Sequence, residues 1–90
     1  MLENKAYFYV LKCADKSFYG GYTTEPNRRL KEHNQGTGAK YTRHRTPVQM
    51  IHLEAFETKS EAMKAEAAFK KLTRTAKCQY LKNTKSEQLP

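Results

Sequence analysis

The stretch Ala6-Tyr7-Phe8-Tyr9-Val10-Leu11-Lys12-Cys13 is rich in aromatic and β-branched residues and predicts a β-strand with apolar side chains on both faces. A strand of this kind is expected at the centre of a sheet. After a turn at residues 14–17, Phe18-Tyr19-Gly20-Gly21-Tyr22-Thr23 returns as an antiparallel partner and completes a hairpin. The two adjacent glycines indicate a bulge or the close approach of another group.

A helix is predicted over residues 26–34, with Thr24 or Glu25 as its cap. It contains a single large apolar residue, which Arg29 and His33 flank on the same side because they stand four positions apart. Core packing alone explains such an inner face poorly, so these two side chains are candidates for a functional site.

A second, longer helix is predicted to begin at a capping box formed by Thr58 and Glu61. A break at residues 73–75 is the alternative to one continuous helix. The buried stripe recurs at helical spacing and consists of Ala62, Ala65, Phe69, Leu72 and Ala76.

A third strand is predicted over residues 48–56, where Gln49 and Glu54 interrupt the apolar residues and favour one side open to water. The basic connection before it has room for one helical turn. The element order predicts an α+β fold of the form β-β-α-β-α, in which helices flank a three-stranded antiparallel sheet. We expect one domain over residues 1–82 and a frayed tail over residues 83–90.

The composition narrows the class of protein. Ninety residues provide a single small domain, and 17 Lys and Arg against 9 Asp and Glu give a net charge of +8. No apolar run approaches the roughly 18 residues that a membrane span needs, and the first residues show no signal-peptide pattern. The two cysteines, Cys13 and Cys78, are expected to be free thiols. These features predict a monomeric cytoplasmic protein that meets an acidic partner.

Two blocks of the chain are strongly basic. Residues 28–45 hold six Lys or Arg against one Glu, and residues 70–85 hold six with no Asp or Glu. Such blocks form an electrostatic footprint for nucleic acid, although a solvated surface is the alternative. Tyr41 is either a stacking group for a base or a packing residue. The candidate nucleic-acid-binding residues are Arg28, Lys40, Tyr41, Arg43, Arg45, Lys70, Lys71 and Arg74.

One ordered set of residues resembles the GIY-YIG nuclease superfamily over roughly residues 6–81. It comprises Tyr9, the triplet Tyr19-Gly20-Gly21, Arg29 with His33, the segment Asn34-Gln35-Gly36-Thr37-Gly38-Ala39-Lys40-Tyr41-Thr42-Arg43, and Glu66. The chain is similar to the small stand-alone, single-domain bacterial members and to the nuclease domain of the Slx-type endonucleases.

The resemblance implies a role for each matched position. It makes Tyr9 and Tyr19 catalytic tyrosines, Gly21 the backbone glycine of the second triplet, Arg29 the contact to the scissile phosphate and His33 the polar residue beside it. Glu66 matches the single metal-binding carboxylate. The sequence departs from the pattern at three positions, because Tyr7 and Phe8 replace the Gly-Ile of the first triplet and Gly20 replaces the isoleucine of the second. A further asparagine found in some members has no clear match beyond Asn83.

The resemblance therefore predicts a DNA endonuclease that uses one divalent ion, Mg²⁺ or Mn²⁺, to hydrolyse phosphodiester bonds, with structure selectivity in repair or recombination and a protein partner for targeting. A tyrosine that acts as a base needs help from a metal, Arg29 or His33, because its free pKa is about 10. The alternative is a nucleic-acid-binding module with little or no turnover. From the residues alone, the interpretation of Glu66 as an ordinary partner of Lys70 is favoured, and the tyrosines are equally core residues. An adaptor for an acidic protein is a third alternative.

Overall fold

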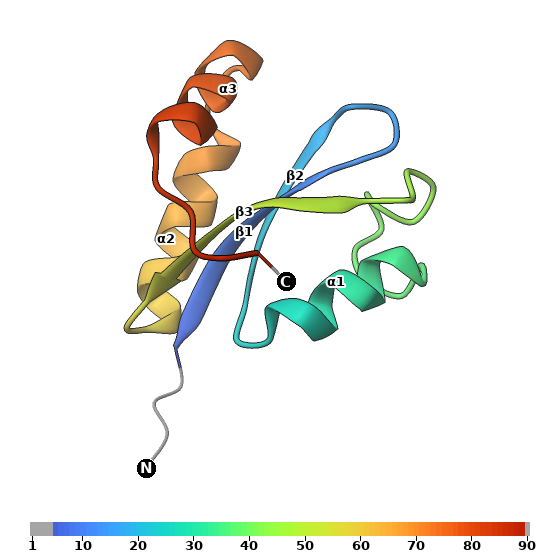
Figure 1. Ribbon diagram of the computed structural model, residues 1–90, viewed down its shortest axis with the longest axis horizontal. Coiled ribbons are helices and arrows are strands. Elements are labelled where there is room, and N and C mark those ends of the chain that lie inside the picture. The colour runs from blue at the N-terminus through green and yellow to red at the C-terminus, as the bar shows by residue number, and fades with distance from the viewer. Residues whose placement is uncertain (1–4, 90) are drawn as a thin grey trace.

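A computed structural model describes residues 5–89 of the chain. A three-stranded antiparallel sheet with the order β2-β1-β3 lies between helices on both faces, which confirms the predicted α+β class (Figure 1). The elements are β1 (Ala6–Lys12), β2 (Phe18–Thr23), α1 (Pro26–Asn34), β3 (Gln49–Phe56), α2 (Lys59–Lys70) and α3 (Arg74–Asn83).

The doubly apolar strand β1 lies at the centre of the sheet, as its sequence predicts. On one face Tyr9 and Leu11 pack with Leu53 of β3 and with Leu30 of α1. On the other face a second cluster centres on Phe8, Val10 and Phe69 of α2, and the side chains packed around it come from α2, α3, β2 and β3. The two clusters place α1 and the α2–α3 pair on opposite faces of the sheet (Figure 1).

The predicted break divides the C-terminal helical region in two. Thr58 and Glu61 form the expected capping box of α2, which ends at Lys70. The Thr73 hydroxyl then accepts a hydrogen bond from the backbone N–H of Ala76 and begins α3. A threonine hydroxyl that satisfies a backbone donor in this way favours a new helix start over the continuation of the old helix. Ala76 consequently belongs to the first turn of α3 instead of extending the stripe of α2.

The structure corrects one expectation about β3. The side of β3 that carries Glu54 is not open to water, because Tyr80 of α3 covers it and donates a hydrogen bond to the Glu54 carboxylate. His52, which is buried, makes a second hydrogen bond of 2.8 Å to the same carboxylate. The sequence could not reveal this because the partner of Glu54 lies 26 residues away on another element.

The residues that follow α3, expected to fray, make specific contacts with β3. The backbone N–H of Leu53 donates to the Ser86 hydroxyl at 3.0 Å, and the backbone N–H of Glu87 donates to the Leu53 carbonyl at 2.6 Å. The connection over residues 36–47 is a series of turns without a helix. Cys13 and Cys78 are free, as expected. No helix in residues 5–89 has the length and apolar character needed to cross a membrane.

Candidate active site

Tyr9 lies directly opposite Gly21 in the β1–β2 pairing. Its side chain is 1% exposed, and a Cβ atom added to Gly21 would stand 2.5 Å from the Tyr9 hydroxyl oxygen. The phenol therefore occupies the space that any other residue at position 21 would fill, which explains the glycine in physical terms. The neighbouring Gly20 faces the other side of the sheet, where an added Cβ would meet the ring of Phe69 at 3.3 Å.

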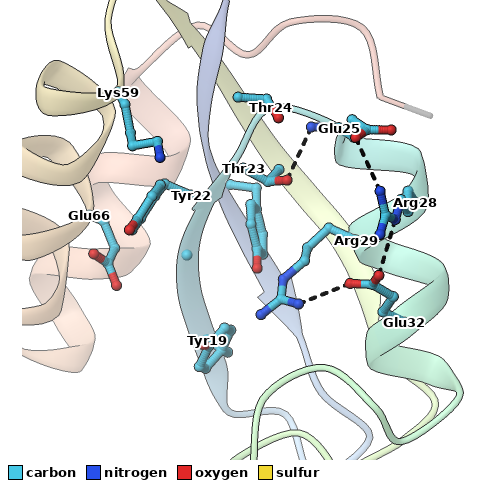
Figure 2. A pocket seen from close by; sticks show the side chains of 12 residues that line it. Tyr19, Tyr22, Thr23, Thr24, Glu25, Arg28, Arg29, Glu32, Lys59 and Glu66 are labelled. Carbon is cyan, nitrogen blue, oxygen red and sulfur yellow. Dashed lines mark hydrogen bonds and ion pairs between the residues drawn. The ribbon is translucent and has the colours of Figure 1, made fainter.

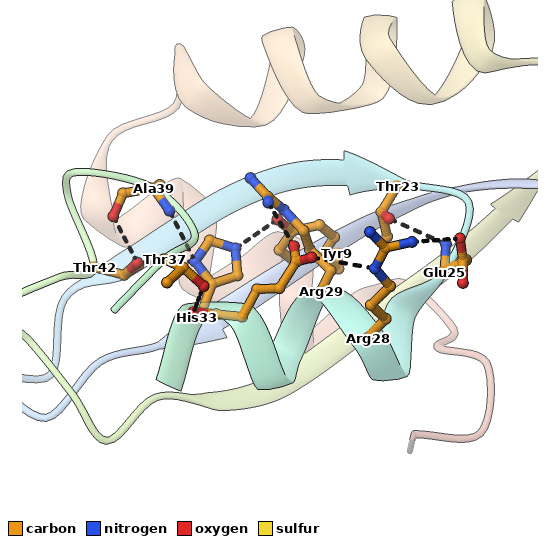
Figure 3. Close-up of polar contacts among 10 residues, drawn as sticks. Tyr9, Thr23, Glu25, Arg28, Arg29, His33, Thr37, Ala39 and Thr42 are labelled. Atoms are coloured by element: carbon orange, nitrogen blue, oxygen red, sulfur yellow. Dashed lines mark hydrogen bonds and ion pairs between the residues drawn. The ribbon is translucent and has the colours of Figure 1, made fainter. Parts of the chain in front are cut away.

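His33 of α1 is held at both ring nitrogens (Figure 3). Its Nε2 lies 2.8 Å from the Tyr9 hydroxyl, and its Nδ1 lies 2.8 Å from the hydroxyl of Thr42. Both His33 and Thr42 are 0% exposed. A Cβ on Gly38 would stand 2.6 Å from His33 Nδ1, so the loop after α1 packs tightly over the imidazole. His33 is thus a buried, fixed member of the site.

Burial and charge set the protonation of this pair. Burial raises the pKa of Tyr9 to about 12, against the opposing effect of the Arg29 guanidinium. Burial, with the positive charge of Arg29, lowers the pKa of His33 to about 4. At neutral pH both groups are uncharged, so a phenol stands against a neutral imidazole. Any use of Tyr9 as a base must therefore be coupled to the departure of its own proton.

A cleft of about 470 Å³ opens beside Tyr9 at the edge strand β2, with residues of α1 on one side of that strand and residues of α2 on the other (Figure 2). Arg29 points into it from α1, and its guanidinium donates to Glu32 at 2.9 Å. The Arg29 bond lowers the pKa of Glu32, with Arg28 contributing to the same effect. The lining residues are Tyr9, Tyr19, Gly21, Tyr22, Thr23, Thr24, Glu25, Arg28, Arg29, Glu32, Lys59 and Glu66.

Glu66 faces the cleft from the side of α2, across β2 from Arg29 (Figure 2). Its carboxylate is 17% exposed and lies 2.7 Å from the ammonium of Lys70. In residues 5–89 no three His, Cys, Asp or Glu side chains gather as a metal-binding group. A hard divalent cation can be held by one carboxylate with waters and substrate phosphate. The oxygen donor of Glu66 suits such an ion once Lys70 releases it.

Three side chains form a stacked column next to the cleft. Tyr19 stacks on Tyr41 with ring centroids 5.8 Å apart and an interplanar angle of 25°. The guanidinium of Arg45 lies 4.0 Å from the centre of the Tyr41 ring and is fixed by Asp15, at 3.0 Å. Tyr19 lines the cleft, whereas Tyr41 is 39% exposed. The Tyr41 ring therefore lies between Tyr19 and the Arg45 guanidinium.

The other basic candidates have different surroundings. Arg28 lines the cleft but pairs with Glu25 and Glu32. Arg74 packs its guanidinium 4.1 Å from the centre of the Phe18 ring and donates to a backbone carbonyl, so part of its role is structural. Three further basic side chains are exposed to solvent and make no ion pair or ring contact within residues 5–89: Lys40, Arg43 and Lys71.

The structure adds residues that sequence reasoning missed. Glu32, Tyr22 and Lys59 line the cleft, and Thr42 and Gly38 hold His33. The glycines at positions 36 and 38 were a usable signal for a tight loop, and Gly36 has a φ of +82°. The contact of Thr42 with His33 left no such signal, because it depends on how that loop folds back.

A guanidinium, a phenol and a carboxylate around one cleft of a basic domain suit a phosphate ester as ligand. Comparison with known proteins likewise indicates a nuclease-type domain. Residues 5–81 match the GIY-YIG catalytic domain, and the chain belongs to that family. The resemblance seen in the sequence is confirmed.

Bacterial relatives cover nearly the whole chain. A UPF0213 protein of Enterococcus faecalis is 74% identical over 85 residues, in an alignment that covers 90% of this chain and 97% of the relative. A UPF0213 protein of Listeria innocua is 60% identical over 84 residues, covering 93% of each chain. The similarity to small bacterial members is therefore confirmed.

Two solved structures share the fold. The solution NMR structure of an Enterococcus faecalis protein is 65% identical, with a TM-score of 0.62 over 97% of this chain and 98% of that one. The solution NMR structure of a UPF0213 protein from Bacillus halodurans is 46% identical, with a TM-score of 0.58 over 87% of this chain and 83% of that one.

Proposed function

We propose that the protein is a metal-dependent DNA endonuclease that hydrolyses a phosphodiester bond in the cleft at the edge strand β2. The observation that carries this proposal is the placement of Arg29 and Glu66 on opposite sides of the cleft, with the Tyr9–His33 pair at its base. Membership in the GIY-YIG family supports nuclease chemistry on nucleic acid. The wider setting is structure-selective cleavage in DNA repair or recombination, in the cytoplasm and with a protein partner for targeting.

Four residues of the chain have separate roles in the proposed reaction. Arg29 binds the scissile phosphate and stabilises the negative charge that grows on it in the transition state. Tyr9 accepts the proton of the attacking water, and His33 holds the phenol in place. Tyr19 lines the same cleft and positions the substrate. The bond between phosphorus and the water oxygen forms as the bond to the leaving oxygen breaks, and the leaving oxygen takes a proton from solvent.

Glu66 is the residue proposed to hold the divalent ion, Mg²⁺ or Mn²⁺. Such an ion, when bound, would supply Lewis-acid stabilisation of the phosphate. The oxygen donor of Glu66 and its place in the cleft lining support this assignment, and Lys70 must release the carboxylate for an ion to bind.

The stacked column supports a substrate with an unpaired nucleotide. Aromatic rings bind the face of any base, at about 1–3 kcal/mol per base, without reading its sequence. Tyr41 offers such a ring beside the cleft when a base displaces the Arg45 guanidinium, and the released cation would then bind the backbone. We therefore propose flapped or branched DNA as the preferred substrate, with Lys40, Arg43 and Lys71 as further backbone contacts.

The proposal is tested by incubating the protein with labelled flapped DNA in Mg²⁺ or Mn²⁺. Glu66→Gln and Arg29→Lys are each expected to lower kcat/KM by at least about 100-fold, as the loss of one preorganised transition-state contact does. Glu57→Gln is the matched control for Glu66→Gln, because Glu57 is exposed at 78%. Cleavage that persists in EDTA, or in both active-site variants, would contradict the mechanism.

A nucleic-acid-binding module with little turnover is the second candidate, favoured by the pairing of Glu66 with Lys70. It predicts binding whose affinity falls with salt in proportion to the number of phosphates contacted. Glu66→Gln would leave that binding unchanged, and no cleavage would accompany it at any metal concentration. Metal-dependent cleavage that is lost in Glu66→Gln excludes this candidate.

A further inference from the structure

Thr42, in the loop after α1, contacts the imidazole of His33. Thr42 has one hydroxyl proton and two neighbours within hydrogen-bond distance of its oxygen. One is the carbonyl oxygen of Ala39 at 3.0 Å, which can only accept. The other is Nδ1 of His33 at 2.8 Å, which either donates or accepts. Both contacts are satisfied together only when the Thr42 proton goes to Ala39 and the Thr42 oxygen accepts from Nδ1.

This arrangement decides which nitrogen of His33 carries the proton. If the Thr42 hydroxyl donates to Ala39, the short contact to His33 is satisfied only when Nδ1 carries a hydrogen. In the competing arrangement the Thr42 hydroxyl and the backbone N–H of Ala39 both donate to Nδ1, but the Ala39 distance is 3.5 Å, at the limit of a hydrogen bond. The contact of 2.8 Å is satisfied in both arrangements, so the choice lies between the bond of 3.0 Å to the Ala39 carbonyl and the bond of 3.5 Å from the Ala39 N–H. The shorter bond favours a protonated Nδ1.

We propose that Thr42 is a positioning residue that fixes His33 as the Nδ1–H tautomer, so that Tyr9 donates its phenolic proton to Nε2 and presents an oxygen lone pair to the cleft. In the opposite tautomer Nε2–H would donate to Tyr9, and the phenol would point its proton at the substrate. The orientation of one buried hydroxyl thus determines whether Tyr9 meets the substrate as an acceptor or as a donor.

The consequence for catalysis rests on the proposed function. When Tyr9 takes a proton from water, its own proton passes to Nε2 of His33, and the imidazolium then donates through Nδ1 to Thr42. A bound phosphodiester favours this transfer, because its negative charge offsets the Arg29 charge that helps to keep His33 neutral. After the product leaves, the proton returns from His33 through Tyr9 to solvent.

The central measurement requires no nuclease activity. Long-range ¹H–¹⁵N NMR spectra of the protein at pH 7 report which ring nitrogen of His33 is protonated. The expected result is a protonated Nδ1 and an unprotonated Nε2. Thr42→Val removes the hydroxyl at nearly constant volume, and the Ala39 N–H then favours Nε2–H, so the tautomer should invert. Thr42→Ser keeps the hydroxyl and should restore the wild-type tautomer.

Two further variants separate positioning from packing. Tyr9→Phe leaves the Thr42 contact in place, so His33 should remain the Nδ1–H tautomer although activity is lost. If Thr42→Val folds and the substrate is cleaved, kcat is expected to fall about tenfold or more with KM unchanged, and Thr42→Ser should recover it. An Nε2–H tautomer in the wild-type protein, or the same tautomer in folded Thr42→Val, would overturn the inference. A wild-type Nδ1–H tautomer without any cleavage would uphold it while rejecting the proposed function.

Discussion

Gly21 and Tyr9 share one space: a Cβ atom on Gly21 would lie 2.5 Å from the Tyr9 hydroxyl oxygen and 2.6 Å from the ring carbon that bears it. Because Tyr9 is buried and bonded to His33, its ring has no free volume to enter. Position 21 therefore needs a glycine because the Tyr9 side chain of the candidate site occupies the space of a Cβ atom, and not because the strand itself requires one.

Gly21→Ala is expected to displace Tyr9, break its hydrogen bond to His33 and lower the free energy of unfolding by about 1–3 kcal/mol, the usual effect of overpacking. Thermal unfolding and cleavage assays measure the two consequences. Gly20→Ala is the matched control, because its Cβ would meet Phe69 on the opposite face at 3.3 Å and leave Tyr9 in place. A folded Gly21→Ala protein with wild-type cleavage would refute this relationship.

The sequence predicted the fold well because each element carries a local signal. Apolar residues on both faces identified β1 as the central strand, and the capping box located the start of α2. The exposure of Glu54 was predicted wrongly. A carboxylate in a strand is expected to face water, and the sequence does not show that Tyr80 covers this one. Local periodicity contains no information on a contact between separate elements.

The residues of the candidate site could be predicted from the sequence, but the hydrogen bonds and stacking contacts between them could not. Arg29 and His33 were identified because core packing alone does not explain an inner helix face that carries an arginine and a histidine. Thr42 and the stacking of Tyr41 on Tyr19 were not predicted, because they depend on the path of the turns over residues 36–47. Loop paths follow from many weak contacts together, and no single spacing in the sequence encodes them.

Lys70 should weaken metal binding at Glu66, since its ammonium lies 2.7 Å from the carboxylate. Glu66 in turn raises the pKa of Lys70, so this cation is present at neutral pH. Removal of the charge in Lys70→Gln is expected to lower the Mn²⁺ concentration for half-maximal cleavage about fivefold, since an exposed ion pair is worth up to about 1 kcal/mol. A Mn²⁺ titration of initial cleavage rates gives this concentration.

Lys71→Gln is the control for Lys70→Gln, because it removes the same charge from the next residue, which is exposed. Both variants lose one cation that attracts the DNA, so any difference between them reflects the carboxylate of Glu66. An equal shift in the two variants, or a higher metal requirement in Lys70→Gln, would show that Lys70 does not compete with the metal.

The stability of the protein should depend on pH through His33. Its pKa is lowered to about 4 in the folded protein from an ordinary 6.5, so between these values the unfolded chain binds more protons. The neutral form contributes its full stability above about pH 6.5, and this is lost as the pH falls towards 4. Between pH 6.5 and 5 the expected loss is about 1.5 kcal/mol, on the order of 8 °C in Tm for a domain of this size.

Thermal unfolding of wild-type and His33→Gln proteins at pH 6.5, 5.8 and 5.0 measures this dependence. Asp15 and Glu32 stay ionised over this range, because hydrogen-bond partners lower the pKa of both carboxyl groups. His33→Gln should start from a lower Tm and change less with pH. The exposed His44 provides the control His44→Gln, which should keep the wild-type slope. Parallel slopes in wild type and His33→Gln would exclude His33 as the source.

Tyr41 should distinguish substrates with an unpaired base from intact duplex. Its ring stacks on Tyr19, which lines the cleft, and a base beside the scissile phosphate can take the place of the Arg45 guanidinium on the other face. Tyr41→Leu keeps the apolar bulk but removes the aromatic face, at a cost of about 1–3 kcal/mol per stacked base. Fluorescence anisotropy should therefore show Kd for flapped DNA rising about tenfold, while Kd for blunt duplex changes little. Equal losses on the two substrates would mean that Tyr41 supports the loop through Arg45 and does not bind a base.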